Sequence, residues 1–305
     1  MCEYNKIDSR EKALDYAIRD YECKKFPVES GYTIKKEKKT YWNYLSNDAW
    51  EEFKGKMKKA HLCQFEDADG GEMKEKKGRW GIYPPKMASF GSSSRFLYSV
   101  SKDIEGFQFE KLLPTRVGGS ANLDGYIMRN DVDFFVEAKC REIYGSHKTV
   151  EISNVYEEIY KELHESYPEF SFKNNGKEDD EHFNCTFKFN GKEIIHFDIK
   201  QLICHFLAIS ANILENENAN KNIKFIYLIF NPKEVIEQVE KESYKKQIIE
   251  IYGDTKKEIT YYFDMERLFK SIFKIQAKRL GLEGKKYSLF EFYFAEQYNY
   301  KEIIK

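Results

Sequence analysis

Alternating apolar and polar positions predict strands in the middle of the chain. Between residues 132 and 140, Phe134, Val136, Ala138 and Cys140 alternate with Asp133, Phe135, Glu137 and Lys139. This period of two is typical of a strand with one apolar face and one mostly polar face. A strand is also expected over 123–128, joined to the first through a polar, hairpin-like turn at 129–131. An earlier strand is expected over 107–113, after a helix that begins at Ser92 and runs to about Lys102.

A second helix and a further strand follow this group. Over 198–216, the residues Leu202, Phe206, Ile209 and Ile213 recur at i, i+4, i+7 and i+11, which predicts an amphipathic helix. The continuous apolar run 223–230 then fits a buried strand, which Asn231-Pro232 ends. The elements from 92 to 230 therefore read helix, strand, strand, strand, helix, strand, within a mixed α/β (α+β) fold.

The flanking segments divide the chain into three parts. Residues 1–86 are expected to be mainly helical and to end in a glycine- and proline-rich linker, with a helix from Asp48 that Asp48 and Glu51 could cap. The core spans 87–232 and carries an insertion at about 146–193, in which we expect a helix at 155–166 and a hairpin at Asn190-Gly191. Residues 233–305 are expected to form a helical extension packed on the core, with a last strand near 287–294.

Composition favours a folded, soluble protein. The chain has 305 residues, of which 41% are hydrophobic, enough for a substantial core, and only 6 are proline and 17 glycine. No apolar run approaches the roughly 20 residues needed to cross a bilayer, and the first residues lack the apolar segment of a signal peptide. We therefore expect no membrane association and a cytoplasmic location. Six scattered cysteines indicate neither a disulfide framework nor a zinc ribbon.

The net charge of −1 neither supports nor excludes nucleic-acid binding, which depends on local patches. Three lysine-rich clusters precede the central strands, at 35–39, 54–59 and 74–79. Each alone reads more simply as solvated surface. Together they are compatible with a DNA-binding face.

Three charged residues carry the candidate chemistry. Glu137 and Lys139 are two apart on one strand and point the same way, and Asp124 lies on the preceding strand. Two carboxylates that converge across neighbouring strands suit Mg²⁺ or Mn²⁺, which prefer oxygen ligands. Gly118, Gly119 and Gly125 would let the backbone approach a ligand. The alternative is an ordinary exposed acid and an exposed ion pair on a strand.

The order of elements, with Asp124 on the second strand and Glu137-Ala-Lys139 on the third, resembles the PD-(D/E)XK nuclease superfamily. The resemblance covers about residues 90–231, and Leu123 stands where the family name implies proline. It implies a restriction-endonuclease-like core with a central mixed sheet flanked by helices. It also implies that Asp124, Glu137 and the Ala138 carbonyl hold Mg²⁺, for which Mn²⁺ could substitute, while Lys139 positions the attacking water or stabilises negative charge.

Four further residues are candidates for supporting roles. Glu110 could add a carboxylate or be an exposed strand residue, and Glu142 could bind a second metal or form an ion pair. Gln201 and His205 are four apart on one helical face, directed either at the site or, for His205, into the core.

By resemblance the chain is expected to be a Mg²⁺-dependent DNA endonuclease, restriction-enzyme-like, that hydrolyses phosphodiester bonds in defence against foreign DNA. A restriction enzyme that cuts both strands usually works as a homodimer and is paired with a cognate methyltransferase. Two alternatives remain open: a repair, recombination or transposon nuclease of the same fold, and a catalytically silent nucleic-acid-binding module.

Overall fold

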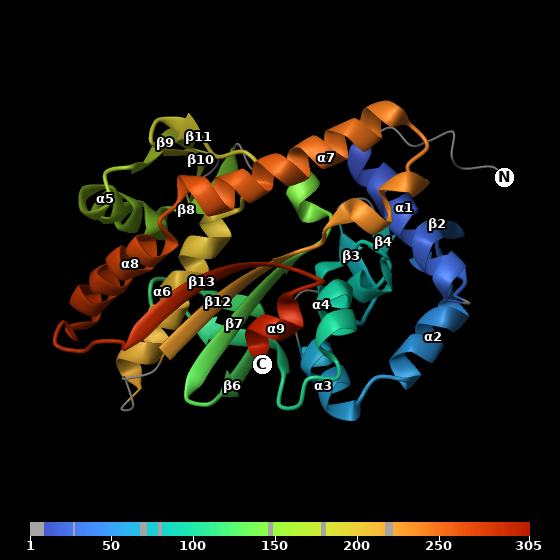
Figure 1. Ribbon diagram of the computed structural model, residues 1–305, viewed down its shortest axis with the longest axis horizontal. Coiled ribbons are helices and arrows are strands. Elements are labelled where there is room, and N and C mark those ends of the chain that lie inside the picture. Colours follow the sequence, from blue (N-terminus) through green and yellow to red (C-terminus); the bar gives the residue numbers. More distant parts are fainter. Residues whose placement is uncertain are drawn as a thin grey trace.

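A computed structural model describes residues 9–26, 28–67, 72–78, 81–145, 149–177, 181–216 and 222–305. Its centre is a five-stranded sheet in the order β13-β12-β7-β6-β5 (Figure 1). The strands are β5 (Gln108–Pro114), β6 (Ser120–Arg129), β7 (Val132–Lys139), β12 (Asn222–Ile229) and β13 (Leu289–Glu296). Strands β5, β6 and β7 are antiparallel neighbours, whereas β12 runs parallel to both β7 and β13. The expected mixed α/β class with a central mixed sheet is confirmed.

The turn between β6 and β7 fixes the register of the two strands that carry the candidate residues. Arg129 pairs with Val132, so Asn130 and Asp131 form a two-residue loop, with φ of 48° and 60°. Asn and Asp tolerate this left-handed region better than most residues, and such loops match the twist of a hairpin. The predicted hairpin is confirmed.

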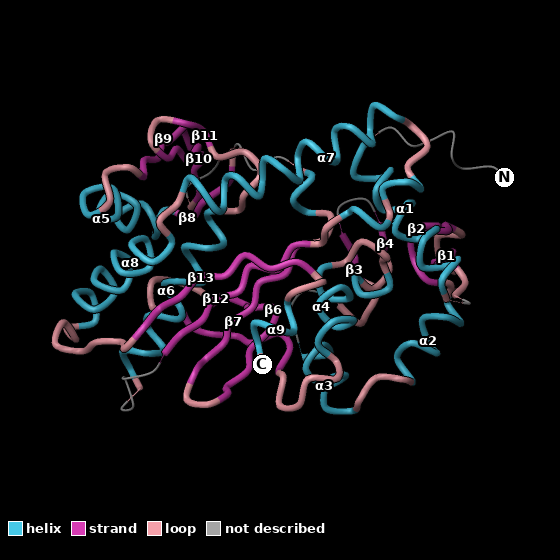
Figure 2. Tube along the Cα trace, viewed as in Figure 1, coloured by secondary structure: helices cyan, strands magenta, loops and turns pink. Residues whose placement is uncertain are grey.

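Helices cover both faces of the sheet. The helix α4 (Ser93–Ser101) begins at Ser92, whose side chain accepts a hydrogen bond from the backbone N–H of Arg95. Leu97 of this helix lies against Gly125, on the face opposite to Asp124. The helix α6 (Ile199–Glu215) covers the other face (Figure 2). There its Gln201 accepts a hydrogen bond from Lys139. The residues of β7 are consequently buried on both faces, apart from half-buried Val132.

The C-terminal segment contributes to the central sheet as well as covering it. It contains α7 (Glu242–Lys257), α8 (Met265–Leu280), β13 and α9 (Tyr300–Ile304). The ring of Phe269 on α8 stacks on Phe290 of β13, with 3.9 Å between centroids. The expected helical extension is therefore too simple a description, because its predicted strand is an edge strand of the core sheet.

The expectation of a mainly helical N-terminal region is wrong in part. Between α1 (Arg10–Lys25) and α2 (Asn47–Gly55) lies an antiparallel hairpin of β1 (Ser30–Ile34) and β2 (Lys39–Leu45). Ser46, not Asp48, caps α2, since its side chain accepts the N–H of Ala49. The linker expected over residues 64–86 contains the end of α3 (Lys59–Asp67) and a short hairpin of β3 (Lys76–Gly78) and β4 (Gly81–Tyr83).

The insertion forms a small sheet of its own. Its elements are β8 (Val150–Ser153), α5 (Glu157–Ser166), β9 (Phe170–Lys177), β10 (His182–Phe189) and β11 (Lys192–Glu193). Strand β10 pairs antiparallel with the other three strands. The hairpin predicted at Asn190-Gly191 connects β10 to β11, and both turn residues have positive φ. Tyr160 of α5 is fully buried against Phe187, which gives this sheet an aromatic core.

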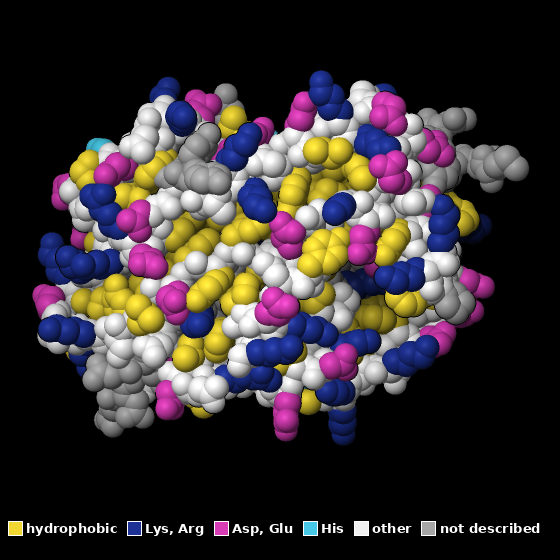
Figure 3. Space-filling model, in the orientation of Figure 1, with side chains coloured by type: hydrophobic (Ala, Val, Ile, Leu, Met, Phe, Trp, Pro, Cys, Tyr) yellow, Lys and Arg dark blue, Asp and Glu magenta, His cyan; other side chains and the backbone are white. Residues whose placement is uncertain are grey.

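The surface mixes both signs of charge. Figure 3 shows Lys and Arg side chains interspersed with Asp and Glu over one face. In the second lysine cluster, Lys54 pairs with Glu51 and Lys56 with Glu52, which partly neutralises it. In the third, Arg79 lies outside the described residues.

Among the described residues, none of the helices combines the length and the apolar character needed to traverse a bilayer.

Candidate active site

Asp124, Glu137 and Lys139 line one cavity of about 210 Å³ beside strands β6 and β7. The cavity lies where β7 ends and α4 begins, so residues from distant parts of the chain complete its wall. These are Tyr44, Glu72, Lys86, Ser89, Gly91, Ser92, Ser93, Ser94, Ala138, Arg141, Glu142 and Gln201. The structure therefore brings the three predicted residues together at one accessible point.

The two carboxylates occupy adjacent strands. The register pairs Gly125 with Val136, and its continuation places Asp124 opposite Glu137. Asp124 Oδ2 accepts the backbone N–H of Ala138 at 2.7 Å, which holds the carboxylate across the β6–β7 boundary. Burial raises the pKa of Asp124 well above its usual range, and the neighbouring charge of Glu137 raises it further. Burial likewise raises the pKa of Glu137 to about 7, although Lys139 opposes the shift.

Lys139 is a buried cation held by two partners. Its Nζ lies 2.6 Å from Glu137 Oε1 and donates a hydrogen bond of 2.5 Å to Gln201 Oε1. Burial lowers the pKa of Lys139, but the charges of Glu137, Tyr227 and Asp124 outweigh it, and the net pKa lies well above 10.5. The side chain therefore carries a fixed positive charge at neutral pH.

Gln201 and His205 share the face of α6 that covers the site, but only Gln201 reaches the cavity. Gln201 lines the cavity, whereas His205 is 2% exposed and does not. The Nδ1 atom of His205 lies 3.5 Å from Glu137 Oε2, below the cavity floor. Burial, and then the charge of Lys139, lower the pKa of His205 to about 3. The imidazole is thus neutral, and it packs beneath the site instead of facing it.

Glu142 has both oxygens engaged by the protein. Oε1 accepts a hydrogen bond from the Ser93 hydroxyl, and Oε2 accepts the N–H of Cys140 at 2.9 Å. The carboxylate therefore ties the turn after β7 to the first turn of α4.

Glu110 extends the row of acids to a third strand. Phe109 pairs with Gly125 and Lys111 with Leu123, so Glu110 lies opposite Asp124. Its φ of 54° is in the left-handed region, which costs a non-glycine strand residue of order 1–3 kcal/mol. Its carboxylate accepts hydrogen bonds from Asn122 and Ser94, and burial, with the charge of Asp124, raises its pKa to about 8. It is half-buried, so the simple exposed-residue alternative is wrong.

Sequence reasoning missed the support given by the N-terminal region. Arg141 Nη1 lies 2.6 Å from Oδ2 of buried Asp15 on α1, and Asn43 donates to the same oxygen at 3.1 Å. A side chain at Gly91 would place its Cβ 2.1 Å from Asp15 Oδ1. The run of serines after Gly91 could have indicated a loop at the site. Asp15 could not be found in this way, because it lies 109 positions before Asp124 and no local pattern links the two.

The glycines near Asp124 serve packing and turns. At Gly125 a Cβ would lie 2.4 Å from the Phe107 ring, so this glycine admits a core aromatic residue and not a ligand. Gly118 and Gly119 have φ of 140° and 75° in the loop between β5 and β6. The expectation that these three glycines open the backbone to a ligand is wrong for Gly125.

The oxygen donors of the site are of the kind that divalent cations prefer, but only a few side chains supply them. Within the described ranges, no group of three or more His, Cys, Asp or Glu side chains is arranged to hold a metal ion. The predicted ligands are two carboxylates and one backbone carbonyl, that of Ala138. The buried Oε2 of Glu137 accepts no hydrogen bond from the described residues, and such an oxygen is satisfied by a cation.

No family model, no curated protein and no solved structure matches this chain.

Proposed function

We propose that this chain is a metal-dependent endonuclease of the restriction-endonuclease-like type, acting on DNA by hydrolysis of phosphodiester bonds. The observation that carries the proposal is the convergence of Asp124, Glu137 and Lys139 on one cavity from adjacent strands. The order α4, β5, β6, β7, α6, β12 supports it, because it is the order that the family resemblance implies.

Asp124, Glu137 and the Ala138 carbonyl would hold Mg²⁺ or Mn²⁺, which would polarise the scissile phosphate and lower the pKa of bound water. Lys139 contributes a permanent positive charge beside these carboxylates. A phosphorane-like transition state gathers negative charge on its oxygens, and a fixed cation stabilises that charge without reorganisation. With its pKa above 10.5, Lys139 does not act as a general base at neutral pH.

The remaining residues hold this arrangement in place. Gln201 accepts a hydrogen bond from the Lys139 ammonium group and thereby fixes its direction. Arg141 lies on the cavity wall, where Asp15 orients one of its nitrogen atoms, and a guanidinium group has further donors that suit a phosphate. We propose that these residues position the DNA backbone.

The direct test is incubation of the purified protein with plasmid and phage DNA in Mg²⁺ or Mn²⁺. We expect cleavage by the unaltered chain and a loss of at least a hundredfold in Asp124→Asn and Lys139→Met. Lys246→Met is the matched control, because this lysine on α7 is 77% exposed and far along the chain from the site. Cleavage that survives both site substitutions would exclude the proposal. Discrete fragments would favour restriction, and selective cutting of branched DNA would favour repair.

A catalytically silent nucleic-acid-binding module is the second candidate. The observation that favours it is the small number of side-chain metal ligands among the described residues. Calorimetry separates the two functions: Mn²⁺ binding that disappears in Glu137→Gln supports the nuclease, whereas DNA binding without Mn²⁺ binding supports the module. If the chain is a restriction enzyme, we also propose that it forms a homodimer and has a partner methyltransferase. Sedimentation of the protein with its DNA tests the homodimer.

A further inference from the structure

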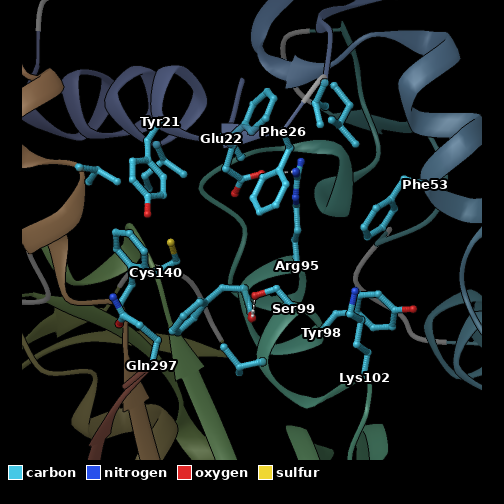
Figure 4. Close-up of a pocket in the computed structure, with 18 of the residues that line it drawn as sticks. Tyr21, Glu22, Phe26, Phe53, Arg95, Tyr98, Ser99, Lys102, Cys140 and Gln297 are labelled. Atoms are coloured by element: carbon cyan, nitrogen blue, oxygen red, sulfur yellow. Dashed lines mark hydrogen bonds and ion pairs between the residues drawn. The ribbon is translucent and has the colours of Figure 1, made fainter. Parts of the chain in front are cut away.

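A second and larger cavity, of about 680 Å³, lies on the other side of β7 from the candidate active site. Its walls come from α1, α2, α4 and the segments that follow β7 and β12, as the close-up in Figure 4 shows. Cys140 lines this cavity, whereas its neighbours Lys139 and Arg141 line the smaller one. The volume is within the range of roughly 300–1,000 Å³ that small-molecule sites occupy.

A buried ion pair lies in the wall of this cavity. Arg95 Nη2 is 2.5 Å from Glu22 Oε2, and the two side chains are 10% and 27% exposed. The Arg95 guanidinium stacks over Phe90 at 4.6 Å and near Phe53 at 5.6 Å. Its Nη1 atom is buried and has no hydrogen-bond partner among the described residues. An unmet buried donor costs about 1–3 kcal/mol, so a ligand acceptor that reached this atom would offset that cost.

The rest of the lining suits a flat ring with an anionic group. Phe26 is 50% exposed and Phe53 is half-buried, and both line the cavity. In Figure 4 Phe26 lies beside Glu22 and Arg95, while Phe53, Tyr98 and Lys102 lie to one side of them. Lys56 and Lys102 are exposed and line the cavity, where Lys56 pairs with Glu52 of the same wall and Lys102 adds a positive charge.

We propose that this cavity binds a purine nucleotide, with the base against Glu22 and Arg95 and the phosphate near Lys56 and Lys102. A carboxylate beside a guanidinium presents an acceptor next to a donor. Guanine matches this pair best, because its O6 acceptor lies next to two adjacent N–H donors, on N1 and N2. The aromatic rings would stack on the base, which contributes about 1–3 kcal/mol per base in nucleic-acid complexes. This site is separate from the proposed nuclease function and does not depend on it.

The test is a titration of the full chain with guanosine, adenosine and cytidine 5′-monophosphates and with inorganic phosphate. Trp50 stacks on Phe53, with ring centroids 5.7 Å apart, so tryptophan fluorescence should report binding, and calorimetry gives the stoichiometry. We expect saturable binding of one guanosine monophosphate, and at least tenfold weaker binding of inorganic phosphate. Absence of saturable binding by every nucleotide would overturn the proposal.

Variants locate the site. Glu22→Gln should remove the preference for guanine, and Lys56→Ala with Lys102→Ala should weaken every nucleotide several-fold. Both lysines are exposed, so we expect the lysine variants to fold. If Glu22→Gln does not fold, nucleotide binding by the lysine variants tests the site. Lys246→Ala is the control. Nucleotide binding that is equal in all variants would place the ligand elsewhere and overturn the proposal.

Competition identifies the source of the base. A single-stranded oligonucleotide with one guanosine that displaces the monophosphate would indicate a base extruded from DNA. A monophosphate that no oligonucleotide displaces would indicate a free nucleotide. Both results support the proposed binding site, and they differ in which ligand occupies it.

Discussion

Glu137 and Lys139 form an ion pair of 2.6 Å inside the protein, where their side chains are 2% and 11% exposed. Two charges at this depth each lose hydration, and each is stabilised only while the other is present. The pair lies between the sheet and α6, with Gln201 and His205 on its far side. Any change to one member therefore acts on both the fold and the candidate chemistry.

The first prediction is that the two residues are strongly coupled in stability. Glu137→Leu leaves the Lys139 ammonium group uncompensated and should lower the free energy of unfolding by about 3–5 kcal/mol, as should Lys139→Met. The double variant should lose much less than the sum, because it buries two apolar groups and no charge. Urea denaturation followed by circular dichroism measures all three. Additive losses would show that the pair does not interact.

The second prediction concerns pH and rests on Glu110. Its pKa is raised to about 8 from 4.5 in the unfolded chain. Between these values the unfolded state releases its proton while the folded state keeps it, so ionisation favours unfolding. The stability contribution is complete below pH 4.5 and is lost as the pH rises through 8. One proton accounts for a slope of at most about 1.4 kcal/mol per pH unit.

Glu110→Gln should flatten this slope. The amide oxygen can still accept the hydrogen bond from Asn122, and the side chain no longer titrates. The free energy of unfolding, measured from pH 5 to pH 8.5, should then fall less in the variant than in the unaltered chain. Glu250→Gln, at an exposed position on α7, is the control. Identical slopes in all three proteins would exclude Glu110 as the source.

Local patterns predicted strands β6 and β7 because period two and a polar turn are properties of neighbouring residues. Asp124, Glu137 and Lys139 could therefore be chosen from the sequence. The same pattern indicated a polar face on β7, yet Glu137 is 1% exposed. Burial of that face depends on α6, whose Gln201 lies 62 positions after Lys139. A strand pattern carries no information about a helix that far away.

Long-range partners explain the other differences. The aromatic-rich segment 287–294 predicted a strand, but its parallel pairing with β12 depends on α7 and α8, which carry the chain back to the sheet. The hairpin of β1 and β2 was missed because its exposed lysines hide the strand pattern, although Gly31 and Lys38 with positive φ mark its bulge and turn. Asp15 belongs to the candidate site only because it contacts Arg141, and this contact is visible only in the folded chain.

The third prediction tests the support that α1 gives to the site. Gly91→Ala would place a methyl carbon 2.1 Å from Asp15 Oδ1, so the carboxylate must move and its ion pair with Arg141 is disturbed. We expect a loss of about 2–4 kcal/mol in stability, typical of a disturbed buried charge pair. Gly253→Ala is the matched control, because nothing lies within 4 Å of its added carbon and α7 should gain about 0.5–1 kcal/mol. Two equal effects would contradict the assigned role of Gly91.

The fourth prediction separates metal ligands from structural acids. If Asp124 and Glu137 hold a divalent cation, Mn²⁺ should raise the thermal midpoint of the unaltered chain, because a ligand that binds only the folded state stabilises it. At a hundred times the dissociation constant the gain is about 2.7 kcal/mol. Excess EDTA should reverse it.

Glu137→Gln should abolish this shift, whereas Glu142→Gln should retain it. Both side chains line the same cavity, but both oxygens of Glu142 already accept hydrogen bonds, from Ser93 and from Cys140. An amide at Glu142 keeps one of these acceptors and removes no metal ligand, so the Mn²⁺-induced shift should stay within experimental error. If Glu142→Gln loses the Mn²⁺-induced rise in thermal midpoint and Glu137→Gln keeps it, the metal site lies at the turn after β7 and not on β7. Differential scanning fluorimetry of the three proteins, with Ca²⁺ as a second cation, decides between these positions.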